Sequence, residues 1–191
     1  MQEILTQLPI RSKRPRENGL TMIMDKGLSL RQAEDFLSLN HEYTDIIKLG
    51  FGTSIITPKI TNKIKLYKEN GMLVYAGGTL FETFAIRDQI NDYKKYLDTI
   101  GVKMMEISDG SITIDHDLKC KYIHDFSKDF QVVSEIGNKN PDVEISANKW
   151  TQYMKDELES GSYAWLNAKS MELVIKKWWN IEKYYKNSHL D

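Results

Sequence analysis

The stretch Met72–Glu82, which reads MLVYAGGTLFE, shows the pattern on which the fold prediction depends. A short apolar run ends at the glycine pair Gly77-Gly78, and a second apolar segment follows directly. Short apolar runs bounded by glycine are typical of buried strands, and a helical pattern after the turn is typical of a strand-to-helix connection. The stretch therefore predicts one strand followed by one helix.

Similar apolar runs recur along the 191-residue chain at nearly regular intervals. Their first residues lie 25 to 31 positions apart, which is the length of a strand plus the helix that covers it. Such alternation indicates a parallel α/β sheet with right-handed crossovers, either a (β/α)8 TIM barrel or an open doubly wound sheet. The runs begin at Leu20, Asp45, Met72, Val102, Gln131 and Ser162.

The segments between the runs have helical periodicity. Thr57-Pro58 predicts a helix start, because threonine is a good N-cap and proline suits the first helical position. Apolar residues at steps of three and four run from Ile86 to Ile100, and Ser146 predicts another helix start.

The composition is that of an ordinary globular domain, with 41% hydrophobic and 28% charged residues and a formal net charge of −1. This near-neutral charge argues against a protein that binds nucleic acids or membrane surfaces in general. The single cysteine, Cys120, excludes an intrachain disulfide and a cysteine-clustered metal site. Apolar runs are too short to span a bilayer, and the N-terminus lacks the apolar core of a secretory signal. We expect one cytoplasmic domain.

Glycine and hydroxyl residues follow two of the predicted strands, at Gly52-Thr53-Ser54 and Gly77-Gly78-Thr79. Backbone N–H groups in such turns, ahead of a helix, can hold a phosphate or sulfonate. The alternative is that both are simple tight turns with helix caps.

Charged residues also gather at the predicted carboxyl ends of the strands. Lys48 and Lys139 could neutralise an anion or transfer a proton. A few carboxylates at the same edge suit Mg²⁺ that is bound jointly with an anionic substrate. The alternative is an ion-pair network with the lysines. The carboxylates are Asp25, Glu106, Asp109 and Glu135.

In these residues the chain resembles the phosphosulfolactate synthase family. The resemblance rests on the ordered motifs DKG, KLGFGTS, GGTLFE, EISDG and SEIGNK, after an RPRENGLT entry into the first strand, and runs from about Leu8 to about Gly161. It implies a (β/α)8 barrel that adds sulfite to phosphoenolpyruvate with Mg²⁺, giving (2R)-phospho-3-sulfolactate. In methanogens that reaction serves coenzyme M synthesis.

The resemblance also suggests roles for the strand-end residues. Lys139 would be the general acid and Lys48 would hold anionic substrate, with Glu135 beside them. The glycine turns at Gly52-Thr53-Ser54 and Gly77-Gly78-Thr79 would bind substrate. Metal ligands would come from Asp25, Glu106 and Asp109. Alternatively, Asp25, Glu106 and Glu135 would form the metal shell or orient the lysines.

After the sixth run the chain departs from the family, which has an EARESG stretch where this chain reads Asn167-Ala168-Lys169. We expect an arm over residues 1–19, barrel units over 20–169 and a divergent helical tail over 170–191. Ser170 would cap that helix, which would carry Val174 and Ile175 on its apolar face. Such a helix could cover an open sheet edge or pair with another chain. Alternatively, the reading frame was lost near Asn167.

The length also affects the prediction of function. Six units of roughly 28 residues fit into this chain, whereas eight would need roughly 225 residues, so we expect an incomplete barrel with about six units. Unpaired strand edges predict self-association, hence a possible homo-oligomer. The alternative to an enzyme is a catalytically inactive relative with a binding or stress-related role.

Three other features suggest no chemistry. A basic cluster near the N-terminus is better explained as an arm at the barrel bottom than as a nucleic-acid site. The histidines lie away from the strand ends, where a surface role is expected, and Cys120 lies within a predicted helix without signs of activation. The basic cluster consists of Arg11, Lys13, Arg14 and Arg16. The histidines are His41, His116, His124 and His189.

Overall fold

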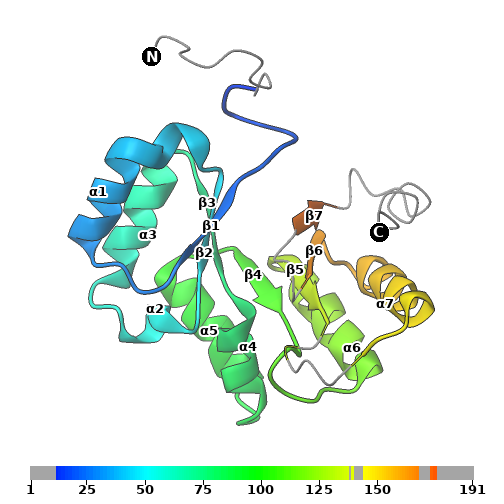
Figure 1. Ribbon diagram of the computed structural model, residues 1–191. Helices are drawn as coiled ribbons and strands as arrows, with labels where there is room; N and C mark the ends of the chain where they lie inside the picture. Colours follow the sequence, from blue (N-terminus) through cyan, green and yellow to red (C-terminus); the bar gives the residue numbers. More distant parts are fainter. Residues whose placement is uncertain (1–11, 138, 140–143, 168–172, 176–191) are drawn as a thin grey trace.

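The computed structural model describes residues 12–137, 139, 144–167 and 173–175 (Figure 1). Strands are found at all six predicted runs, and a short seventh strand follows them. The strands are β1 Met22–Asp25, β2 Ile46–Leu49, β3 Leu73–Ala76, β4 Met104–Ile107, β5 Gln131–Ile136, β6 Ala164–Asn167 and β7 Leu173–Ile175. The α-helices are α1 Leu30–Asn40, α2 Thr53–Ile56, α3 Ile60–Glu69, α4 Gly78–Ala85, α5 Ile90–Ile100, α6 His116–Ser127 and α7 Ala147–Glu159; a 3₁₀ turn, η1, spans His41–Tyr43.

The strand order identifies the fold class. Each of the strands β1 to β6 pairs in parallel with the next strand in the chain, and the order β1-β2-β3-β4-β5-β6 has no reversal. A doubly wound sheet reverses its strand order at a switch point, whereas a (β/α)8 barrel adds each strand beside the last one. The described residues therefore form an incomplete (β/α)8 barrel with six parallel strands, as predicted.

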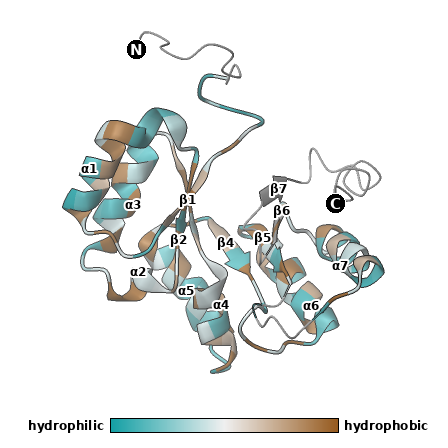
Figure 2. Cartoon of the chain, viewed as in Figure 1, coloured by the Kyte–Doolittle hydropathy of each residue, from teal (hydrophilic) through white to brown (hydrophobic). Residues whose placement is uncertain are grey.

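The helices lie on the convex side of the curved sheet, from α1 and α3 at one end to α6 and α7 at the other (Figure 1). Two apolar clusters fill the space between sheet and helices, one around Tyr67 and Val74 and the other around Phe81 and Val132. Hydrophilic residues are prominent on the outward sides of α1, α3 and α7 (Figure 2). This arrangement is that of amphipathic helices packed on a buried parallel sheet.

A third cluster lies on the concave side of the sheet, where the interior of a barrel would be. It contains Ile46, Tyr75, Met104 and Val133, with Leu166 from β6. Ile46, Met104 and Val133 each precede a charged residue by two positions on the same strand. Tyr75 and Leu166 lie beside charged residues in the register. The apolar layer therefore forms the floor under those charges.

Two helix boundaries differ from the sequence predictions. Thr57 does not cap a helix at Pro58: it ends α2 and donates a hydrogen bond to the Thr53 carbonyl, while α3 begins at Ile60. Ile86 does not belong to the buried face of α5, because α4 ends at Ala85 and Ile86 is exposed. The prediction for Ser146 is confirmed, since its hydroxyl accepts a hydrogen bond from the Lys149 amide at the start of α7.

The predicted C-terminal helix is wrong for Leu173–Ile175, which form β7 and pair antiparallel with β6. The pairing satisfies the outer edge of β6, and this edge is the physical reason for a strand at that position. The rest of the predicted tail, 170–172 and 176–191, lies outside the described residues, and with it the predicted cap Ser170 and His189.

The basic residues near the N-terminus hold the segment before β1 against the amino ends of the strands. Arg16 donates to Asp45 at 2.7 Å, and Arg14 donates to the carbonyls of His41 and Gly71. They border an open hollow of about 570 Å³ at this end of the sheet. This agrees with the predicted arm at the barrel bottom; Arg11 lies outside the described residues. Among the described helices, none is long and apolar enough to cross a membrane.

Candidate functional site

Three charged side chains reach the concave side near the carboxyl ends of the strands. Lys48 lies opposite Tyr75 in the β2–β3 register, and Glu106 lies opposite Val133 in the β4–β5 register. Tyr75 and Val133 belong to the concave cluster, and Glu135 follows Val133 by two residues on β5. Because side chains alternate across a sheet, the three charged residues share the concave face.

The charges alternate in sign across the site. Lys48 Nζ donates to Glu106 Oε1 at 2.9 Å and lies 3.6 Å from Glu135 Oε2. Lys139 Nζ lies 3.3 Å from Glu135 Oε1. The structure thus brings together Lys48, Lys139, Glu106 and Glu135, which the sequence placed at three strand ends.

Burial distinguishes the two lysines. Lys48 and both glutamates are buried, whereas the Lys139 side chain is 40% exposed. Burial raises the pKa of Glu135, and the neighbouring charge of Glu106 raises it further, against the opposite effects of Lys48 and Lys139. The Glu135 carboxyl group therefore ionises less readily than that of a free glutamate.

Glu106 Oε2 is buried and accepts no hydrogen bond, and the buried Glu135 Oε1 has an ion pair with Lys139 but no hydrogen bond. Lone pairs of this kind are costly to leave without a partner. Carboxylate oxygens are the ligands that Mg²⁺ prefers, usually one or two from the protein with the rest from substrate and water. The pair Glu106 and Glu135 therefore fits a Mg²⁺ ion bound together with an anion.

The turn at Gly77-Gly78-Thr79 was predicted to bind an anionic substrate through its backbone N–H groups, and in the structure one of these groups binds a side chain of the protein. The Gly78 amide at the start of α4 donates to Glu106 Oε1 at 2.8 Å, so it holds a carboxylate of the protein. A Cβ on Gly78 would lie 2.7 Å from Glu106 Oε1, and one on Gly77 would lie 2.9 Å from Lys48 Cε. The glycines allow β3 and α4 to approach these side chains, and Thr79 follows them half-buried.

The turn at Gly52-Thr53-Ser54 leads into the short helix α2. Gly52 has a left-handed φ of 67°, which suits glycine, and Thr53 donates both its amide and its hydroxyl to the Gly50 carbonyl. Ser54 is buried, and its hydroxyl has no hydrogen-bond partner among the described residues. These contacts close a turn, and the Ser54 hydroxyl faces away from the paired charges.

Asp25, predicted as a metal ligand, lies on the helix side of the sheet. It is opposite Leu49, whose side chain belongs to the cluster between β2 and the helices. Its Oδ1 accepts from the Gly27 and Leu28 amides, and its Oδ2 accepts from Tyr67 and pairs with Lys63 at 2.7 Å. With both oxygens occupied, Asp25 holds the turn after β1.

Asp109, the third predicted ligand, is paired with Lys119 of α6 at 2.8 Å. Among the described residues, no three or more His, Cys, Asp and Glu side chains form a group that could hold a metal ion. Asp25, Glu106 and Asp109 therefore do not converge, and Glu106 with Glu135 is the pair in which each carboxylate has a buried oxygen without a hydrogen bond.

Sequence reasoning missed buried charges that connect helices to the segments after the strands, among them Lys63, Lys119 and Glu82. Glu82 of α4 accepts from the Ser108 hydroxyl at 2.5 Å, and this contact holds the segment after β4. Lys63 and Lys119 share the buried helix faces with Ile64 and Ile123. A lysine in an inward helical position was the available signal, because such a charge needs a buried partner.

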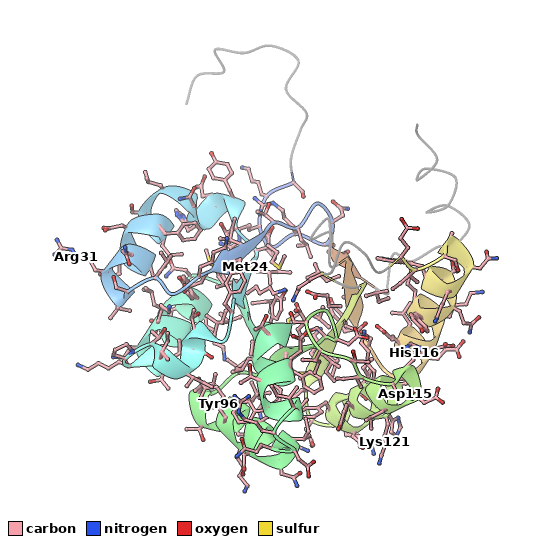
Figure 3. The ribbon with its side chains drawn as sticks, turned by 60° about the horizontal axis from the view of Figure 1, so that its bottom comes forward. Met24, Arg31, Tyr96, Asp115, His116 and Lys121 are labelled. Carbon is pink, nitrogen blue, oxygen red and sulfur yellow. The ribbon has the colours of Figure 1, made fainter. Side chains whose placement is uncertain are left out.

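The histidine and cysteine predictions fit in most respects. Cys120 is half-buried, and burial raises the pKa of its thiol, so it is not activated. His41 and His124 are exposed. His116 at the start of α6 is an exception to the surface prediction: its ring stacks on Tyr153 and lies 3.3 Å from Asp156, both on α7 (Figure 3).

Residues 9–169 match the family model described as (2R)-phospho-3-sulfolactate synthase (ComA). Phosphosulfolactate synthase of Bacillus subtilis (strain 168) is 33% identical over 164 residues, which are 85% of this chain and 65% of that protein. Phosphosulfolactate synthase of Methanothermobacter thermautotrophicus is 36% identical over 137 residues, 70% of this chain and 53% of that protein. The chain thus spans between about half and two thirds of these relatives.

A solved structure of 3-hexulose-6-phosphate synthase from Salmonella typhimurium aligns with a TM-score of 0.47 and 18% identity. The alignment covers 76% of this chain and 61% of that one.

Proposed function

The chain belongs to the (2R)-phospho-3-sulfolactate synthase family, and from this premise we propose that it adds sulfite to phosphoenolpyruvate. The product would be (2R)-phospho-3-sulfolactate. Both substrates are small anions, so the proposal requires positive charge at the carboxyl ends of the strands. A cytoplasmic location and the absence of nucleic-acid and membrane partners remain predictions.

The observation that supports the proposal best is the row of alternating charges Glu106–Lys48–Glu135–Lys139 above the apolar floor. Burying ionic groups costs desolvation free energy, so a buried row of charges indicates a functional requirement. Lys48 is neutralised by two glutamates, whereas the half-exposed Lys139 is reachable from solvent. This arrangement suits one lysine that binds and one that exchanges a proton.

In the proposed reaction the sulfur lone pair of sulfite forms a bond to the methylene carbon of phosphoenolpyruvate. The π electrons of the carbon–carbon bond move toward the carboxylate, and the carbon that bears the phosphate then takes a proton. Lys139 Nζ would give that proton and regain one from water, since its side chain is 40% exposed. Lys48 would hold the anionic substrate against the floor.

Glu106 Oε2 and the Glu135 carboxylate would hold Mg²⁺, in place of Asp25 and Asp109. When bound, Mg²⁺ would supply positive charge that stabilises negative charge on the substrate carboxylate. The Gly78 amide and Lys48 would keep Glu106 oriented, because both donate to its other oxygen. Glu135 would in addition keep Lys139 near the substrate.

The test is to incubate the purified chain with phosphoenolpyruvate, sulfite and MgCl₂ and to follow the phosphorus by ³¹P NMR, with the product identified by mass spectrometry. We expect a sulfite-dependent product with the mass of phosphosulfolactate. A reaction without sulfite and the variant Glu135→Gln are the controls. Absence of product at every Mg²⁺ concentration, with the chain folded, would contradict the proposal and favour an inactive relative.

A further inference from the structure

A buried lysine on α6 connects three separate segments next to the site. Lys119 Nζ lies 2.8 Å from Asp109 Oδ1 in the segment after β4 and 2.8 Å from Glu157 Oε1 on α7. It also donates to the main-chain carbonyl of Glu135 at 2.6 Å. The ammonium group donates hydrogen bonds to Asp109 and to the Glu135 carbonyl, and its contact with Glu157 is an ion pair.

Two of the three contacts lead directly to the charges of the proposed site. The Glu135 carbonyl belongs to the residue whose carboxylate lies between Lys48 and Lys139. Asp109 precedes Gly110, whose carbonyl accepts a hydrogen bond from the Lys139 amide at 3.1 Å.

The space between these segments is narrow at Gly110. A Cβ on Gly110 would lie 2.8 Å from Glu135 Oε1 and 3.1 Å from Lys139 Cε. The main chain at Gly110 therefore forms one wall of the space in which the Glu135 carboxylate and the Lys139 side chain lie. Lys119 connects this wall, through Asp109, to the main chain at the end of β5.

We infer that Lys119 is a positioning residue for the proposed reaction, which holds the Glu135 main chain and the Asp109–Gly110 segment at a fixed separation and so places Glu135 and Lys139. This inference rests on the proposed function. Lys119 does not itself face the concave side: it shares the buried face of α6 with Ile123 and Phe126.

The charge of Lys119 is retained in spite of its burial. Burial alone would lower its pKa, but Glu157 and Asp109 together raise the pKa above its ordinary value. A well-packed apolar residue often stabilises a fold at least as well as a buried ion pair, so stability alone does not require a lysine here. A requirement for fixed geometry at Glu135 and Lys139 explains why a lysine is present at position 119.

The experiment compares two double variants that each neutralise one buried lysine and its partner carboxylate. Lys119→Met/Glu157→Gln removes the connection to Glu135, and Lys63→Met/Asp25→Asn removes the equivalent buried pair between α3 and the turn after β1. Readouts are kcat and KM for phosphoenolpyruvate, the thermal midpoint, and the pH titration of the Glu135 carboxyl group followed by ¹³C NMR.

We expect Lys119→Met/Glu157→Gln to lower kcat by about 10- to 100-fold with KM changed less than about threefold, as for other residues that orient a site from behind. The Glu135 titration should move in this variant and stay in place in Lys63→Met/Asp25→Asn. Lys119→Arg, which keeps a charged donor, should recover part of the activity.

The inference is overturned if the Glu135 titration is unchanged in Lys119→Met/Glu157→Gln, or if both double variants change it equally. It is also overturned if activity falls only in proportion to the thermal midpoint. The titration needs no turnover: a wild-type chain without activity would refute the proposed function, and the NMR comparison would still decide on Lys119.

Discussion

At the scale of single side chains, the site depends on how two buried glutamates share their surroundings. Glu106 has one oxygen bonded to Lys48 and the Gly78 amide, and its other oxygen has no hydrogen bond. Glu135 meets both site lysines but keeps a raised pKa because of burial and Glu106. Glu106 Oε2 and the Glu135 carboxyl group are therefore the places in this site where a cation or a proton can bind.

The protonation of Glu135 should respond to Glu106 in a defined direction. The pKa of Glu135 is raised in the folded chain, so as the pH falls this carboxyl group takes up its proton at a higher pH than an exposed glutamate does. Mg²⁺ binding should weaken over that same pH range. By the same shift, ionisation of Glu135 disfavours the folded state as the pH rises through the raised pKa. Glu106→Gln removes one cause and should lower the midpoint of the Glu135 ¹³C titration; a midpoint that rises or stays would contradict the shared site.

Lys139 should matter for turnover far more than for folding. Lys139→Ala removes the proposed acid and should lower kcat by about 100- to 10,000-fold. Because the side chain is 40% exposed, its removal should cost about 1 kcal/mol of stability or less, as measured by urea unfolding. Lys155→Ala, an exposed lysine on α7, is the control and should retain full turnover. Unchanged turnover in Lys139→Ala would remove this residue from the mechanism.

At the scale of elements, buried lysines connect helices to the turns that follow the strands. Lys63 of α3 pairs with Asp25 and donates to the Leu28 carbonyl at 2.7 Å, so α3 holds the turn after β1. Lys119 of α6 does the same for the end of β5. Both lysines reach through the apolar layer between helices and sheet, so that helix packing and loop position are coupled.

Breaking the pair between α3 and β1 should therefore be costly. Lys63→Met leaves the buried Asp25 carboxylate without its cation and should lower the free energy of unfolding by about 3–5 kcal/mol. Lys65→Met, two positions along the same helix, breaks an exposed pair with Glu69 and should cost about 1 kcal/mol or less. Urea unfolding measures both, and equal losses would show that the Lys63 pair is not a structural connection.

Much of the secondary structure could be predicted because strands and helices leave local periodic signals. All six strands lie at the apolar runs, and Ser146 caps α7 as predicted. The error at Thr57-Pro58 arose because capping residues also end helices, as Thr57 does for α2. The error at Leu173–Ile175 arose because an apolar segment of three residues takes the structure of its neighbour, here the edge of β6.

At the scale of the whole molecule, the sheet is an arc with two ends. Among the described residues, β1 pairs only with β2. The carbonyls of Thr21 and Asp25 bond to the β2 side, so the main-chain groups of Met22 and Met24 face the outer edge. The side chains of both methionines are only half-buried. An edge of this kind is a template for pairing with another chain.

The 191-residue chain should therefore self-associate through β1. Met24→Lys places a charge on this strand and should weaken association by about tenfold or more, because charged side chains on edge strands oppose pairing. Arg31→Glu, on the outward side of α1 (Figure 3), is the control and should leave association unchanged. Sedimentation velocity over a concentration series measures both. Equal association constants for wild type and Met24→Lys would place the contact elsewhere.

The sequence by itself determined the alternation of strands and helices and the strand ends at which charges gather, because periodicity and turn residues are local properties. It also contained the ordered motifs of the family. Which charges meet was decided by the tertiary structure. The side on which a strand residue lies depends on sheet register, and register placed Asp25 against Lys63 on the helix side and Glu106 beside Glu135 on the concave side. Contacts between distant segments, such as that of Lys119 with the Glu135 carbonyl, exist only after the helices have packed on the sheet.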